Sequence, residues 1–169
     1  MTEQLDFGWV YDLTPLATFR MVTRLEYLTE EARHLDHRQH AVLELREREG
    51  LFRYVAQRQV DIGSRARLFA SKPILKQTQI WQLPNWDGFR RFDVTAEISG
   101  TSVNITGDGA VTPVGAGGTR LSLSLVIEAR GRLAGGRAEA EIAQALSSTI
   151  EAEHGFRSIW LERQGHTGF

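Results

Sequence analysis

The stretch Gly136–Arg163 most constrains how this chain can fold, because its pattern predicts one long helix. After Gly136 it contains no proline and one glycine, Gly155, and Glu139 and Arg163 lie at the ends that the helix dipole favours. At about 1.5 Å per residue, this helix would be roughly 40 Å long and would cross a whole small domain. Residues at helical spacing form one broad stripe along it: Ile142, Leu146, Thr149, Ile150, Glu153, Phe156 and Trp160.

Most of the chain before this helix alternates between apolar and polar residues, as β-strands do. The alternation is clearest in Thr119–Ala129. Glu49-Gly50 predicts a tight hairpin, and Gly107 and Gly109 predict a bulge or strong curvature in their strand. The other expected strands are Leu5–Leu13, Val42–Glu49, Leu51–Ile62, Leu75–Leu83, Phe89–Ser99 and Ser102–Val114.

Two short helices are expected directly after the first strand. Thr14 suits the N-cap of one and Pro15 its first turn, and the second should begin after Thr29, with Glu30 and Glu31 in its first turn. Strands grouped together with helices at both ends indicate an α+β fold. We therefore expect one domain over residues 1–169, with a core at about 5–163 and a tail at 164–169. Its antiparallel sheet should curl around the long C-terminal helix.

The composition excludes several classes of protein. The 169 residues are 41% hydrophobic and 24% charged, which is ordinary for a globular protein. The absence of cysteine excludes disulfides, zinc–thiolate sites and thiol nucleophiles. A net charge of -1 gives no reason to expect nucleic-acid binding. No apolar run approaches the roughly 20 residues of a membrane span, and the N-terminus lacks the pattern of a signal peptide, so we expect a cytoplasmic protein.

The order of elements and several short motifs resemble a known family. The motifs are Trp9–Pro15, Gln79–Trp81, Gly118-Thr119 and Leu133–Glu139 (LAGGRAE). They resemble the DUF2505 family of the START-like, polyketide cyclase superfamily (SRPBCC), over nearly the whole chain from Leu5 to Leu161. This resemblance implies the helix-grip, Bet v 1-like fold. It also implies a cavity between sheet and helix that often contains an apolar or amphipathic small molecule, and no shared catalytic residue.

Two charged residues fall at positions that should face such a cavity. Glu153 interrupts the apolar stripe of the long helix, and Arg58 lies among the inward residues of its strand. As a pair they could orient a ligand, or act as an acid or base. The favoured alternative is that Glu153 reaches water and Arg58 extends its charged end to the surface, because charged side chains are rarely buried. The candidate cavity lining, for whose aromatic members core packing is the alternative, is Phe52, Tyr54, Arg58, Trp81, Phe92, Thr149, Glu153 and Phe156.

Three histidines, His34, His37 and His40, are spaced three residues apart. Two of them could face one metal ion from a helix, but the third turns away, and zinc sites need three or four converging ligands. A solvated helix end explains the pattern better, so we expect neither a metal nor a cofactor.

Three functions remain open from the sequence. The first is a non-enzymatic protein that binds a hydrophobic or amphipathic molecule, lipid- or polyketide-like. The second is an enzyme of cyclase, dehydratase or isomerase type, in which Glu153 with Arg58 or Tyr54 does acid–base work. The third is a partner-binding module with a filled core, which would form a stable complex or homodimer. The sequence identifies no catalytic residue.

Overall fold

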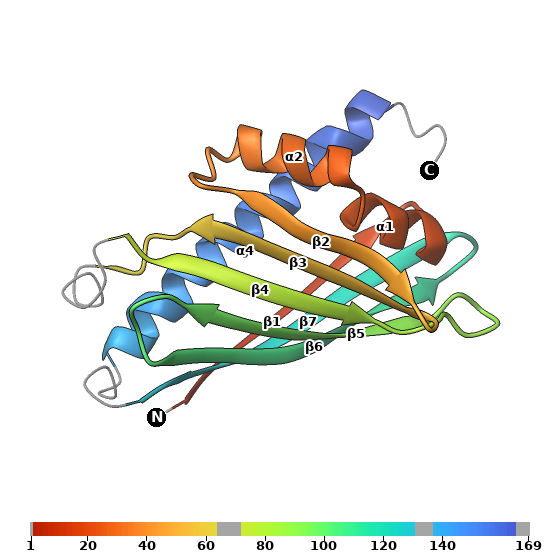
Figure 1. The fold of residues 1–169 in the computed structure, drawn as a ribbon. Helices are drawn as coiled ribbons and strands as arrows, with labels where there is room; N and C mark the ends of the chain where they lie inside the picture. Colours follow the sequence, from red (N-terminus) through yellow and green to blue (C-terminus); the bar gives the residue numbers. More distant parts are fainter. Residues whose placement is uncertain (1, 64–71, 131–136, 165–169) are drawn as a thin grey trace.

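The computed structural model describes residues 2–63, 72–130 and 137–164, and confirms the α+β architecture. A seven-stranded antiparallel sheet curves around a long helix, α4 (Figure 1). The strands are β1 (Thr2–Tyr11), β2 (Ala41–Arg48), β3 (Leu51–Gln59), β4 (Ile74–Trp81), β5 (Arg90–Ile98), β6 (Val103–Val114) and β7 (Gly118–Ala129). The described helices are α1 (Pro15–Val22), α2 (Leu25–His34) and α4 (Arg137–Gln164).

The strands lie in the order β1-β7-β6-β5-β4-β3-β2. Strands β2 to β7 follow chain order as consecutive neighbours, and β1 joins beside β7, so β1 and β2 form the two edges. Every second residue of β5, from Phe92 to Ile98, is buried, and those between are exposed. This is the predicted alternation, with one face of the sheet turned to the core.

Of the bulge or strong curvature predicted at the glycines of β6, the bulge is wrong, and the strong curvature stays a prediction. The register of β6 runs without a shift against both β5 and β7. The glycines instead permit close approach: a Cβ at Gly107 would lie 2.0 Å from the carbonyl oxygen of Ser124, and one at Gly109 would lie 2.2 Å from Cζ of Phe92. The irregularity lies in β2, where the register shifts between Val42 and Glu44.

The two short helices have different kinds of start. The predicted cap of α1 is confirmed, because Oγ1 of Thr14 accepts a hydrogen bond from the Ala17 amide at 3.2 Å. The predicted start of α2 is wrong. The helix begins at Leu25 after Arg24, which makes no side-chain cap, and Thr29 lies within the helix, where its hydroxyl donates to the Leu25 carbonyl. Packing of the apolar face of α2 outweighs the capping signal.

Helix α4 confirms the predicted long helix from Arg137 onward, while Gly136 lies outside the described residues. It crosses one face of the sheet and contacts β1, β7 and α2 (Figure 1). Glu139 is fully buried at its start and accepts a hydrogen bond from the Ala129 amide at 3.4 Å, which ties α4 to the end of β7. Of the expected tail, Gln164 is the last helical residue, and 165–169 lie outside the described residues.

Candidate functional site

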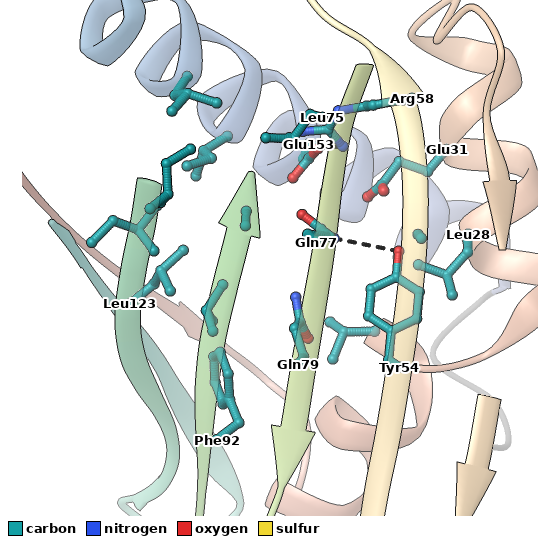
Figure 2. A pocket seen from close by; sticks show the side chains of 18 of the residues that line it. Leu28, Glu31, Tyr54, Arg58, Leu75, Gln77, Gln79, Phe92, Leu123 and Glu153 are labelled. Carbon is teal, nitrogen blue, oxygen red and sulfur yellow. Dashed lines mark hydrogen bonds and ion pairs between the residues drawn. The ribbon is translucent and has the colours of Figure 1, made fainter. Parts of the chain in front are cut away.

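A cavity lies between the concave face of the sheet, α2 and α4, and its volume is about 100 Å³. Figure 2 shows Leu123 and Phe92 on one side, Arg58, Glu153 and Glu31 on the other, and Gln77 and Gln79 between them. The cavity therefore has an apolar side and a charged side. Much of the apolar lining comes from β5, β6, β7 and α4: Phe92, Val94, Ala96, Ile105, Leu121, Leu123, Leu125, Leu146 and Ile150.

The charged side is built around an ion pair between β3 and α4. An Nη atom of Arg58 lies 2.6 Å from Oε1 of Glu153, and only 11% and 13% of the two side chains are exposed. The alternative that the sequence favoured, with both groups reaching water, is therefore wrong. The Oε1 atom has no hydrogen-bond partner among the described residues, so the contact is an ion pair without hydrogen-bond alignment.

Glu31 of α2 adds a second carboxylate that the sequence analysis did not assign to the cavity. It is 8% exposed and lines the cavity, and its Oε2 accepts a hydrogen bond from the Tyr27 hydroxyl. Burial and the nearby Glu153 carboxylate raise the pKa of Glu31 to about 7. Glu31 therefore exchanges a proton near neutral pH, as an acid–base group would. In the sequence, Glu31 follows Tyr27 and Leu28 by four and three residues, which places all three on one helix face once α2 is taken to begin at Leu25.

Arg157 of α4 connects the cavity to the edge strand β1. It donates a hydrogen bond to the Tyr11 hydroxyl at 3.3 Å, and that hydroxyl lies 2.8 Å from Nδ1 of His154. The histidine tautomer decides whether Tyr11 or His154 donates the hydrogen bond between them. Burial lowers the pKa of Arg157, but the neighbouring Tyr27, Tyr11 and Glu31 outweigh this and raise its pKa overall, so the side chain is a cation.

Three uncharged polar side chains contribute to the lining of the cavity. Tyr54 of β3 and Gln77 and Gln79 of β4 all line it (Figure 2). Burial raises the pKa of Tyr54 well above its ordinary value, so its hydroxyl remains protonated. The glutamines were detectable in the sequence, because they have the same parity along the strand as the inward-facing Trp81.

The other predicted cavity residues have different positions. Trp81 and Phe92 line the cavity and stack with their ring centroids 4.0 Å apart. Phe52 and Phe156 are not part of its lining: Phe52 packs edge-on against Phe19, and Phe156 is buried beside α2. Thr149 faces the outer groove described next. Binding of a ligand by these residues stays a prediction.

An open groove of about 630 Å³ lies outside the charged side of the cavity, between α4, the end of β3 and the connection from α2 to β2. Arg58 lines both the groove and the cavity, so the Arg58–Glu153 pair lies between the two spaces. His37 also lines the groove, and burial together with the Arg58 charge lowers its pKa to about 4. It is therefore a neutral imidazole near pH 7.

The three evenly spaced histidines do not converge. The His34 ring packs against Phe156 with centroids 5.1 Å apart, while His37 and His40 lie beyond the end of α2 with their rings 6.5 Å apart. Within residues 2–63, 72–130 and 137–164, no group of three or more His, Cys, Asp or Glu side chains is placed to bind a metal ion. In the same ranges, no helix is both long and apolar enough to cross a membrane.

Solved structures share this fold at low sequence identity. The Zhui aromatase/cyclase from Streptomyces sp. R1128 has a TM-score of 0.59 at 14% identity, over 90% of this chain and 89% of its own. The protein Ms6760 from Mycobacterium smegmatis has a TM-score of 0.58 at 12% identity, over 95% and 92%. A START superfamily protein from the same organism has a TM-score of 0.52 at 12% identity, over 90% and 94%. At these identities, the likeness shows the fold alone.

Sequence comparison identifies the family more directly. No protein with a curated description matches the chain. The model of the family described as "Protein of unknown function (DUF2505)" matches residues 8–161, which is most of the chain. The protein therefore belongs to the DUF2505 family and has the START-like, helix-grip fold.

Proposed function

We propose that this protein binds an amphipathic small molecule, lipid- or polyketide-like, in the cavity between the sheet and α4. The apolar part of the ligand lies against the leucines of β7, and its polar part lies toward the Arg58–Glu153 pair. The observation that carries this proposal is the set of charged groups on one side of an interior space whose opposite side is lined by apolar residues of β5, β6 and β7. Burying such groups costs free energy that a filled core would avoid, which speaks against the third function, a partner-binding module.

The size of the cavity adds a condition to this proposal. Its volume of about 100 Å³ is below the roughly 300–1,000 Å³ of most small-molecule sites. A ligand of ordinary size must therefore widen the cavity or extend into the groove of about 630 Å³. Separation of Arg58 from Glu153 would join the two spaces, since this pair lies between them.

Thermal unfolding with a panel of fatty acids, flavonoids, sterols and naphthoates tests the proposal. A ligand at 100 times its Kd adds about 2.7 kcal/mol to the free energy of unfolding, which raises Tm by roughly 5–10 °C in a chain of this size. Ala96→Leu adds three carbons to the inward face of β5 and should abolish the rise, whereas Thr95→Leu, on the exposed face, should not. No rise with any member of the panel, or equal rises in all three proteins, would contradict the proposal.

The pKa of Glu31, near 7, favours a second candidate function in the same cavity. Glu31 could remove and return a proton in a dehydration or ring-closing condensation, as in an enzyme of cyclase or dehydratase type. This places the acid–base group on α2, instead of on Glu153. Glu31→Gln should then abolish turnover of a β-hydroxy carbonyl compound while leaving its binding within about threefold. Equal turnover by Glu31→Gln would exclude this role for Glu31.

A further inference from the structure

Strand β4 places two polar side chains on the inward face of the sheet. Its inward positions are Leu75, Gln77, Gln79 and Trp81, and the outer two of these are fully buried apolar residues. The two glutamines are half-buried although they line an interior cavity, so part of their surface faces the cavity space. A sheet face that packs against a core ordinarily carries apolar residues there.

The hydrogen-bonding capacity of these amides is mostly unused. Nε2 of Gln77 lies 3.5 Å from the Tyr54 hydroxyl, which is a marginal hydrogen bond. Oε1 of Gln79 accepts from the Trp81 indole at 3.0 Å, and its amide nitrogen makes no hydrogen bond within the described part of the chain. Neither amide is among the fully enclosed polar atoms that lack a partner, so both can reach a molecule in the cavity.

The neighbouring side chains leave room around Gln77. In the register of the sheet, Gln77 lies between Ala56 of β3 and Ala96 of β5, and both are inward-facing. Their single methyl groups do not cover the amide. Gln79 lies between Tyr54 and Val94, and the Tyr54 hydroxyl lies 3.5 Å from Nε2 of Gln77, so the three polar groups form one cluster.

Two buried polar groups that stabilise the fold differ from Gln77 in their hydrogen bonds. The Thr119 hydroxyl is fully buried and donates to the Leu13 carbonyl at 2.6 Å, and the buried Glu139 accepts from the Ala129 amide. Each joins two segments of the chain. Gln77 makes no comparable link, so its amide has no evident structural task.

We propose that Gln77, Gln79 and Tyr54 form a hydrogen-bonding subsite in the middle of the cavity, selecting a ligand with hydroxyl or carbonyl oxygen on its apolar skeleton over a plain hydrocarbon skeleton. This inference rests on the proposed function. A plain alkyl or aryl skeleton would displace water from these groups without replacing its hydrogen bonds, which weakens binding. The preferred ligand therefore carries a hydroxyl or carbonyl oxygen on its skeleton, which a simple saturated fatty acid lacks.

Two acids that differ by one hydroxyl group, 2-naphthoate and 6-hydroxy-2-naphthoate, test this selection by calorimetric titration. The wild-type protein should bind the hydroxylated acid roughly 10- to 100-fold more tightly. Gln77→Leu and Tyr54→Phe should bring the ratio of the two Kd values to within about threefold of one. Gln82→Leu makes the same chemical change at an exposed position beyond β4 and should leave the ratio unchanged. Equal binding of the two acids by wild type, or an unchanged ratio in Gln77→Leu, would overturn the subsite.

The stability of Gln77→Leu tests the inference without any ligand. If the Gln77 amide binds a ligand and does not stabilise the fold, its replacement by an apolar side chain leaves Tm unchanged or raises it. A fall of several degrees, with no fall in Gln82→Leu, would show that Gln77 supports the fold and would overturn the inference. Failure of both naphthoates to bind would count against the proposed function, and the Tm comparison would still decide on the subsite.

Discussion

Replacing Arg58 and Glu153 one at a time should destabilise the protein more than replacing both together. Each single change, Arg58→Met or Glu153→Leu, leaves one charge in a nearly enclosed site, since 11% and 13% of the side chains are exposed. Breaking a buried pair costs about 3–5 kcal/mol. Glu31 also attracts Arg58, so Glu153→Leu should cost less, about 2–3 kcal/mol, whereas Arg58→Met leaves Glu153 beside Glu31 and should cost the full amount of about 3–5 kcal/mol. The double variant substitutes apolar groups for both charges and should lie within about 1 kcal/mol of wild type.

Urea denaturation of the four proteins measures the coupling between the two side chains, which should be at least about 2 kcal/mol. The matched control is the Arg53–Glu44 pair, 3.3 Å apart and 51% and 37% exposed, where Arg53→Met and Glu44→Leu should couple by less than about 1 kcal/mol. If the changes in the free energy of unfolding caused by Arg58→Met and Glu153→Leu simply add in the double variant, the two side chains do not form a buried ion pair.

Four further substitutions should separate local causes of stability. The pKa of Glu31 is raised from 4.5 to about 7, so the contribution of Glu31 to stability is present below pH 4.5 and is lost as the pH rises through 7. Across this range, the free energy of unfolding of wild type should fall by about 3 kcal/mol relative to that of Glu31→Gln, as measured by urea denaturation at each pH. The difference between the two proteins is the informative quantity, because the lowered pKa of His37 gives wild type and variant alike a slope of opposite sign. Gly107→Ala should lower the free energy of unfolding by at least about 2 kcal/mol, because the new Cβ meets a backbone oxygen at 2.0 Å, whereas Gly155→Ala, with nothing within 4 Å, should raise it by about 0.5–1 kcal/mol in the same assay. Thr14→Ala should cost about 1 kcal/mol through loss of the α1 cap, measured by thermal unfolding; no change there would show that the cap is dispensable.

The architecture was predictable because its elements have strong periodic patterns. In β5, buried and exposed residues alternate without exception from Phe92 to Ile98. In α4, buried residues recur at helical spacing from Ala138 to Leu161. The capping signal correctly predicted Thr14 as the N-cap of α1, which begins at Pro15. It failed at Thr29, because packing sets the start of α2 and Arg24 makes no side-chain cap.

The candidate site was predictable only in part, because cavity groups depend on how elements are rotated against one another. Arg58 and Glu153 each carry a charge at an apolar position of a regular pattern, which is visible along the sequence. Glu31 follows Tyr27 and Leu28 at helical spacing, but this spacing indicates a cavity position only when α2 starts at Leu25 and is packed against β2 and α4. The general rarity of buried carboxylates also argues against selecting it in advance.

Native mass spectrometry of the purified protein, with and without the ligand panel, tests the central claim that the cavity is a ligand site. We expect wild type to retain a small molecule that is released on unfolding, and Ala96→Leu, which fills the inward face of β5, to retain none. Thr95→Leu should behave as wild type does. A wild-type protein that retains no member of the panel, or an Ala96→Leu protein that retains the same molecule as wild type, would contradict it.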